Sequence, residues 1–284
     1  AMYRAKAQGR GGYEVFDDAM RQHVLERVAI EGDLREALGR RQIEVHYQPI
    51  VRLADGVVAG AEALARWRHP VRGLVEPDLF LPTAEESRLI VPVGREVLEL
   101  ACLQLARWRR DGVVGEDWPV SVNASPTELD DPGFLTAVDE ALARASLPPR
   151  ALRIELTENT LIAKPEAAAR VLDALNERGV RLAIDDFGTG YSSLSTLHRL
   201  PFDTLKIDKS FVMGLTEADT RWEILRAIVT LAGSLGLEVV AEGVDTRIAG
   251  EGLLSLGCRY GQGFRLGRPV PADELSLSAA ASRV

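Results

Sequence analysis

Two adjacent carboxylates, Asp185 and Asp186, stand at the end of a short apolar stretch and at the start of a glycine-containing loop. Neighbouring carboxylates repel each other, and in a site shielded from water one of them keeps its proton unless a cation neutralises the pair. A divalent metal ion is the simplest such cation. Gly188 and Gly190 allow backbone conformations that other residues avoid, so the loop can fold tightly over the pair. The alternative is an aspartate that caps a helix beside a solvated neighbour.

Other apolar stretches are also interrupted or ended by a single polar residue, and these residues are Glu62, Asn123, Glu155, Lys206, Glu242 and Gln262. An ionised group is costly to bury unless it is paired, hydrogen-bonded or bound to a metal. One such residue could belong to a buried salt bridge. A series of them, delivered by successive strands of a parallel barrel, would meet at the mouth where barrel enzymes carry their active sites.

The residue types at these positions favour a hard metal ion. Carboxylate and amide oxygens suit Mg²⁺ or Mn²⁺, whereas the sequence has only four histidines and none at these positions, which disfavours zinc. A cluster of this size can hold two ions, which in phosphodiester hydrolysis activate the attacking water and stabilise the leaving oxygen. Lys206 could hold the water or the phosphoryl oxygens, and Glu242 could act as the general base or complete the coordination of the second ion.

Strand-like apolar stretches alternate with helical patterns along most of the chain. We expect strands over residues 43–50, 57–67, 120–124, 152–157, 180–185, 204–207, 237–241 and 258–261, and helices over 91–110, 133–144, 165–178, 218–235 and 246–256. A short turn at Asp55 and Gly56 makes the first two strands a hairpin, so one of them runs antiparallel to the rest. The alternation predicts an α/β fold, a (β/α)8 TIM-type barrel. An open, doubly wound sheet is the alternative, but its glycine-rich fingerprint is missing.

Composition limits the partners of the chain. A net charge of −8 over 284 residues argues against a general binding face for DNA or RNA, which needs a basic surface. A small anionic ligand is still compatible, because bound metal ions and a few arginines reverse the charge locally. The sequence contains neither an apolar run of membrane-spanning length nor a signal peptide, so we expect no membrane contact by this segment. Cys102 and Cys258 are far apart in apolar surroundings, which indicates buried free thiols in a reducing cytoplasm.

The run DDFGTGYSSL, from Asp185 to Leu194, resembles the signature loop of the EAL domains, which are bacterial phosphodiesterases of the second messenger cyclic di-GMP. AEALARW, at Ala61 to Trp67, is similar to the motif that names this family, and the resemblance covers nearly all of residues 34–275. It implies the metal ligands Glu62, Asn123, Glu155, Asp185 and Asp186, the catalytic residues Lys206 and Glu242, a Glu158 that braces the DDFGTG loop, and the substrate contacts Gln48, Leu64, Arg66 and Gln262. Arg66 would hold substrate phosphate, and Gln48 would lie near a guanine base.

The resemblance implies metal-dependent hydrolysis of cyclic di-GMP to linear 5'-pGpG, with two Mg²⁺ or Mn²⁺ ions, in bacterial signalling. A sensor that binds cyclic di-GMP without cutting it is the alternative from another class, and a barrel acting on a different phosphodiester is a third. The chain departs from the family pattern at Ala124, Asn159, Asp245 and Arg265. None of these positions is an expected metal ligand, but Asp245 is shorter than the glutamate that the pattern has there.

The first residues, AMYRAKAQGR, resemble the last helix of the GGDEF (diguanylate cyclase) domain. We therefore expect a GGDEF remnant at 1–16, a helical linker at 17–33, the EAL barrel at 34–275 and a tail at 276–284. The resemblance also implies upstream GGDEF or sensory domains and a homodimer. The expected location is the cytoplasm, either as a free protein or as the cytoplasmic portion of a larger, membrane-anchored one.

Overall fold

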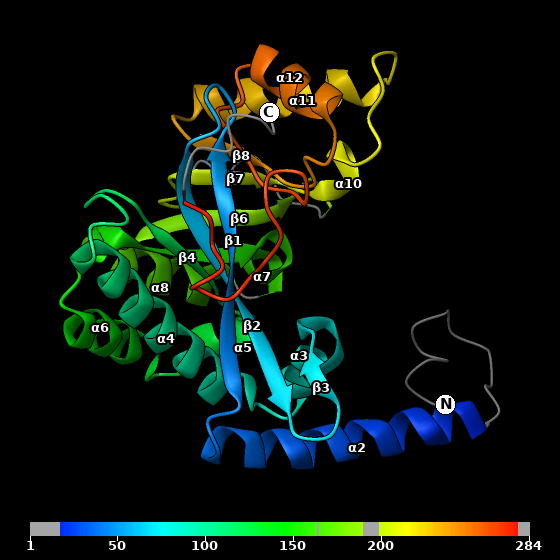
Figure 1. Cartoon of the computed structure of the whole chain (residues 1–284), viewed down its shortest axis with the longest axis vertical. Helices are drawn as coiled ribbons and strands as arrows, with labels where there is room; N and C mark the ends of the chain where they lie inside the picture. Colours follow the sequence, from blue (N-terminus) through cyan, green and yellow to red (C-terminus); the bar gives the residue numbers. More distant parts are fainter. Residues whose placement is uncertain (1–17, 164, 190–198, 278–284) are drawn as a thin grey trace.

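The computed structural model describes residues 18–163, 165–189 and 199–277 (Figure 1). The expected GGDEF remnant at 1–16, the second half of the DDFGTGYSSL loop and most of the expected tail lie outside the described residues.

The central sheet has nine strands, and all except β3 form a closed ring, which confirms the predicted barrel. β1 is antiparallel to both of its neighbours, β2 and β9, whereas the other neighbours in the ring are parallel. The expectation of one antiparallel strand in the first pair is therefore confirmed. The ring consists of β1 Ile43–Arg52, β2 Val58–His69, β4 Val120–Asn123, β5 Leu152–Thr157, β6 Arg181–Phe187, β7 Thr204–Ile207, β8 Glu238–Ala241 and β9 Tyr260–Gly261.

The sheet also contains a short strand, β3 (Gly73–Val75), that was not among the predicted strands. It pairs antiparallel with the end of β2, from Trp67 opposite Val75 to His69 opposite Gly73. β1 and β2 extend beyond the ring to this small hairpin, which lies near α2 and α3 (Figure 1). A three-residue strand carries too little alternation to be recognised in a sequence.

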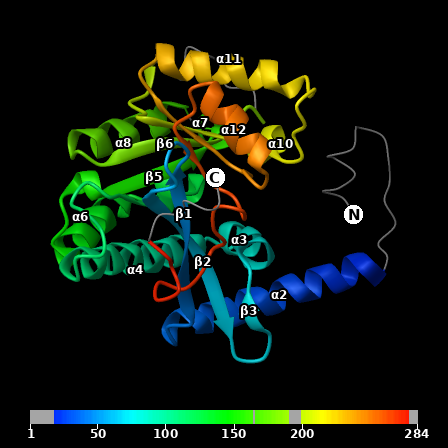
Figure 2. The same ribbon diagram turned by 45° about the horizontal axis from the view of Figure 1, so that its top comes forward.

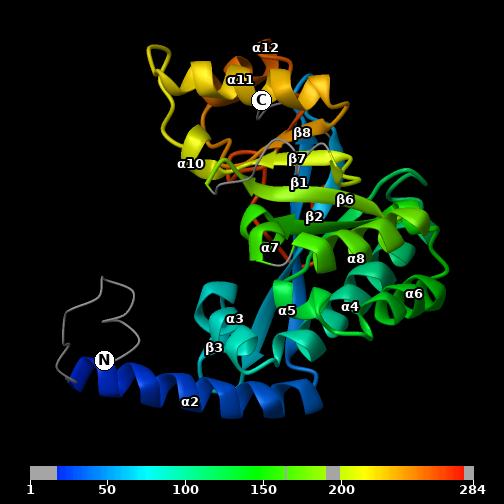
Figure 3. The ribbon, with the colours of Figure 1, turned by 180° about the vertical axis from the view of Figure 1, so that it is seen from behind.

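Long helices cover the outside of the ring, close to the predicted ranges. α4 (Ile90–Arg110), α6 (Phe134–Ala145) and α8 (Pro165–Glu177) lie along one side (Figure 3). α11 (Arg221–Ser234) and α12 (Arg247–Ser255) lie in the part of the domain that is far from α2 (Figure 2). A helix face with apolar residues three and four apart must be covered, and on α4 Val97, Ala101 and Leu105 are buried.

Three short helices follow directly after the carboxyl ends of strands in the ring. They are α5 (Pro126–Leu129) after β4, α7 (Glu158–Ala163) after β5 and α10 (Lys209–Val212) after β7. These connections start at the carboxyl ends of the strands, the edge at which barrel proteins place functional residues.

The N-terminal helix α2 (Asp18–Gly39) is continuous through Gly32, and its far end extends away from the barrel (Figure 1). Ile30, Leu34 and Ala37 are buried, so its C-terminal part belongs to the core of the domain. α3 (Pro77–Glu86) packs near it. Among the helices of the described ranges, none combines the length and the apolar character that crossing a membrane requires.

The two faces of the strands have different residues. Successive side chains of a strand point to opposite faces, and on β5 the buried Ile154 and Leu156 alternate with Glu155. Glu155 contacts Lys206 of β7, so this polar face lines the inside of the barrel. The two cysteines are buried and free, as expected.

Candidate active site

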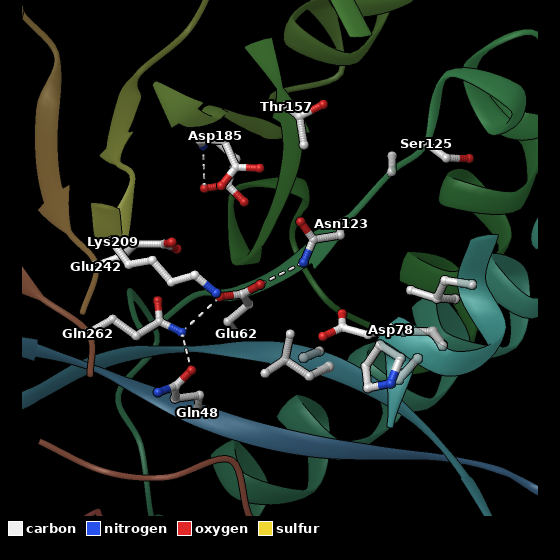
Figure 4. Close-up of a pocket in the computed structure, with 18 of the residues that line it drawn as sticks. Gln48, Glu62, Asp78, Asn123, Ser125, Thr157, Asp185, Lys209, Glu242 and Gln262 are labelled. Atoms are coloured by element: carbon white, nitrogen blue, oxygen red, sulfur yellow. Dashed lines mark hydrogen bonds between the residues drawn. The ribbon is translucent and has the colours of Figure 1, made fainter. Parts of the chain in front are cut away.

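A cleft of about 720 Å³ opens at the carboxyl ends of the strands (Figure 4). Eight of the expected site residues line it, and they are Gln48, Glu62, Leu64, Asn123, Asp185, Asp186, Glu242 and Gln262. Residues from one end of the domain to the other thus meet at a single opening, because each follows or interrupts a strand of the same ring.

Lys206 lies beneath the cleft at the centre of a buried acidic cluster. Its Nζ is 2.6 Å from Glu155 Oε2 and 2.7 Å from Glu242 Oε1. It also lies 3.2 Å from Glu62 Oε2 and 3.3 Å from Asp185 Oδ1. One ammonium therefore joins carboxylates that lie on or directly after four strands, and it offsets their mutual repulsion.

Amide side chains fix the orientation of Glu62. Asn123 Nδ2 donates to Glu62 Oε1 at 2.6 Å, and Gln262 Nε2 donates to Glu62 Oε2 at 2.8 Å. Gln262 Nε2 also donates to Gln48 Oε1 at 2.9 Å, and Gln48 Nε2 donates to the Gly267 carbonyl. The dashed lines in Figure 4 trace this chain from one wall of the cleft to the other. The amide oxygen of Asn123 remains available to a ligand, since its nitrogen makes the bond to Glu62.

A β-bulge brings the two adjacent aspartates to the same site. Neighbouring residues of a regular strand face opposite sides, but the register between β6 and β7 shifts between Ile184 and Phe187. Asp186 adopts a left-handed conformation with φ of 54°, and its N–H donates to Asp185 Oδ1 at 2.9 Å. Asp185 and Asp186 consequently both have carboxylate oxygens within 4.8 Å of an oxygen of Glu242.

Burial shifts the pKa values of the acidic groups in the cluster, because Lys206 is the one cation among these described residues. Burial raises the pKa of Glu155 to about 7 and that of Glu242 to about 8, although the Lys206 ammonium acts in the opposite direction. Burial and the neighbouring Asp185 raise the pKa of Asp186 to about 6. For Glu62, burial is outweighed by Lys206 and the amide donors, so its pKa lies below the ordinary value. The cluster has more negative charge than Lys206 neutralises.

The donor set fits divalent metal ions. Two groups of carboxylates each have oxygens within 4.8 Å of one another, Glu62 with Glu155 and Asp185, and Asp185 with Asp186 and Glu242. Glu155 Oε1 is buried and has no hydrogen-bond partner among the described residues, so it is an oxygen left for a cation. All of these ligand atoms are hard oxygens, which suit Mg²⁺ and Mn²⁺ better than zinc.

The remaining two expected residues lie outside this cleft lining. Glu158, the first residue of α7, accepts a hydrogen bond from the Gly188 N–H at 3.0 Å and thus contacts the loop that follows Asp186. Arg66 is buried, its Nη1 donates to the Ala65 carbonyl, and its Nε lies 3.1 Å from Glu76 Oε2. The structure therefore does not bring Arg66 together with the other substrate contacts.

Several residues near the site were not predicted. Asp208 follows β7 directly, is buried, and interacts with Asp186. Its signal was the same as that of the others, a carboxylate at the end of an apolar strand. Lys209 and Glu128 also line the cleft. At the departure from the family pattern, Asp245 Oδ1 accepts a hydrogen bond from the Phe264 N–H at 2.6 Å, so it supports the segment after Gln262.

Comparison with known proteins agrees with this geometry. Residues 31–269 match the EAL domain family. The chain is 46% identical over 280 residues to MucR of Pseudomonas aeruginosa, a bifunctional diguanylate cyclase/cyclic di-GMP phosphodiesterase, covering 99% of this chain and 41% of that protein. It is 40% identical over 272 residues to the cyclic di-GMP phosphodiesterase PdeR of Escherichia coli, covering 96% of this chain and 40% of that one. The chain therefore spans less than half the length of these relatives.

Solved structures share the fold. A complex of the MucR phosphodiesterase with c-di-GMP has a TM-score of 0.83 at 46% identity and covers 87% of this chain and 100% of that one. The EAL domain of Mycobacterium smegmatis DcpA has a TM-score of 0.69 at 39% identity, covering 84% and 96%. The matched range contains the whole ring of strands and every residue of the acidic cluster, and the chain belongs to the EAL domain family.

Proposed function

We propose that this chain hydrolyses one phosphodiester bond of cyclic di-GMP and releases linear 5'-pGpG. The observation that carries the proposal is the acidic cluster around Lys206, which opens into a cleft and retains every expected metal ligand. The similarity to MucR, PdeR and NbdA, all named as cyclic di-GMP phosphodiesterases, supports the choice of substrate.

Two Mg²⁺ or Mn²⁺ ions are proposed at this cluster. Glu62, Asn123, Glu155 and Asp185 would hold the first, and Asp186 would contribute to the second, with Asp185 or Glu242 beside it. Such ions supply an activated water and stabilise negative charge on the oxygens of the phosphate.

Lys206 and Glu242 are the residues that we assign to proton transfer and charge stabilisation. Glu242 is assigned as the general base, because its carboxylate lines the cleft and lies beside Asp185 and Asp186. Lys206 Nζ lies 2.7 Å from Glu242 Oε1 and offers donors to water or to the phosphoryl oxygens. Glu158 acts indirectly in this proposal, since its bond to the Gly188 N–H orients the loop after Asp186.

Gln48, Leu64 and Gln262 are proposed to contact the substrate, because all three line the cleft. Arg66 is also proposed to hold phosphate, with its Nε 3.1 Å from Glu76, whose side chain is 59% exposed. The upstream GGDEF or sensory domains, the homodimer and the cytoplasmic location also remain proposals that follow from the family resemblance.

A product assay tests the proposal. The purified chain is incubated with cyclic di-GMP and either Mg²⁺ or Mn²⁺, and the nucleotides are separated by chromatography. We expect pGpG to appear with at least one of the two ions and to be absent after chelation. If neither ion supports pGpG formation, the proposal is wrong, and binding of cyclic di-GMP without cleavage would identify a sensor.

A further inference from the structure

The charge of the cleft is strongly unbalanced for a site that takes an anion. Among its described lining residues, Lys209 provides the only lysine or arginine side chain. Eight acidic side chains line the same cleft, and they are Glu62, Asp78, Glu85, Glu128, Asp185, Asp186, Glu242 and Asp245. An anionic substrate therefore meets a single protein cation on the described walls.

Two other cations near the acidic cluster, Lys206 and Arg66, are already paired. Lys206 Nζ lies within 3.3 Å of four carboxylates and is fully buried. Arg66 is paired with Glu76 and does not line the cleft. Lys209, by contrast, is exposed and makes no ion pair with any residue in the described ranges. Within those ranges, no carboxylate competes with a ligand for its ammonium.

The base of the Lys209 side chain is fixed by its surroundings. Lys209 is the first residue of α10, directly after Asp208, whose Oδ1 accepts the Ser210 N–H at 3.0 Å. A Cβ atom on Gly243 would lie 2.8 Å from Lys209 Cβ, so the backbone next to Glu242 packs directly against this side chain. Figure 4 shows Lys209 pointing into the cleft from the wall that also carries Glu242.

We propose that Lys209 binds a phosphate group of the substrate and is a residue on which affinity depends. The inference rests on the proposed function, since cyclic di-GMP has two phosphodiester groups with one negative charge each. A lysine ammonium is a compact charge with three donors, which suits the non-bridging oxygens of a phosphate. Because Lys209 is the only such side chain on the described walls, its loss has no substitute there.

The test compares Lys209→Gln with Lys209→Arg and with a control, Arg226→Gln. Arg226 lies on α11, has a side chain that is 60% exposed and is absent from the cleft lining, so its replacement removes the same charge elsewhere. A charged hydrogen bond to phosphate corresponds to roughly a tenfold to hundredfold change in affinity. We expect Lys209→Gln to raise KM by this factor with kcat within about threefold of the wild type. Lys209→Arg restores most of the affinity, and Arg226→Gln leaves KM unchanged.

Binding is also measured without turnover, by calorimetry with cyclic di-GMP in the Glu242→Gln background. Lys209→Gln should weaken this binding by the same factor and reduce its dependence on salt concentration, because one charge contact is lost. An unchanged KM and an unchanged calorimetric affinity in Lys209→Gln would refute the inference while wild-type turnover leaves the proposed function intact. If the wild-type chain neither binds nor cleaves cyclic di-GMP, the proposed function itself fails, and this inference fails with it.

Discussion

Replacement of Glu128 by glutamine should change how the stability of the protein depends on pH. Glu128 belongs to α5 and is only 6% exposed, beside the cleft. Its Oε2 accepts the Ser125 N–H at 2.9 Å and the Ser125 Oγ–H at 2.7 Å. Burial nevertheless raises the pKa of Glu128 to about 7, since these two bonds only partly compensate for the lost water.

The direction and size of the change in the free energy of unfolding with pH follow from proton linkage. Between the ordinary value of 4.5 and about 7, folded Glu128 keeps a proton that the unfolded chain has released. The free energy of unfolding therefore falls as pH rises through this interval and levels off above it. At about 1.4 kcal/mol per pH unit, the interval corresponds to about 3 kcal/mol of stability that the wild type loses and the Glu128→Gln variant keeps.

Urea unfolding at about pH 5 and about pH 8 measures this difference for both proteins. The glutamine has its own cost, because its amide must fit against Gly94, where Glu128 Oε1 now lies. That cost is the same at both pH values, so it cancels in the comparison. Glu140→Gln, an exposed change on α6, is the matched control for the loss of one carboxyl group. If Glu128→Gln and the wild type lose the same stability between the two pH values, the ionised, buried Glu128 is not costly and the reasoning is wrong.

Three further perturbations test the site and its loop. Glu62→Ala and Asp185→Ala remove proposed metal ligands. Loss of a residue that only supports a metal ligand typically lowers activity by about 10–100-fold, so turnover should fall by more than that in these variants. Near-normal product formation in both would contradict the site. Lys206→Met leaves four carboxylates, three of them buried, without their cation, so we expect a loss of about 3–5 kcal/mol in unfolding experiments. Added Mg²⁺ should recover more stability in this variant than in the wild type, and equal recovery would count against a metal site there. Gly188→Ala places a methyl group 2.7 Å from the Phe211 ring at a φ of 101°, which should cost roughly 1–3 kcal/mol and lower turnover; unchanged thermal stability would show that the loop adapts.

The ring of strands and the polar residues on it could be predicted because both follow from local patterns. Burial on both faces produces continuous apolar strands, and a single polar residue such as Glu155 or Lys206 stands out against them. Asp208 is likewise a carboxylate directly after an apolar strand, β7, so the same pattern could have predicted it. The bulge at Asp186 could not be predicted, since a left-handed aspartate within a strand has no distinct sequence pattern.

Contacts between side chains that are distant in the sequence also could not be predicted. The pairing of Arg66 with Glu76 depends on where α3 begins relative to the end of β2, which no local pattern reports. The raised pKa of Glu128 likewise depends on its contact with Gly94, from a different helix. Motif matching names the residue types of a site, whereas the direction in which each side chain points depends on the packing of elements that are distant in sequence.

The strand that closes the ring also limits the order of events during synthesis of the protein. β1, near the start of the domain, must pair with β9 at Tyr260 and Gly261, and Tyr47 bridges to Val270. A nascent chain that ends before these residues leaves one edge of β1 without its partner and lacks Gln262. Such long-range pairing is slow and exposes unpaired strand edges to aggregation. The acidic cleft can therefore be completed only after nearly the whole domain has left the ribosome.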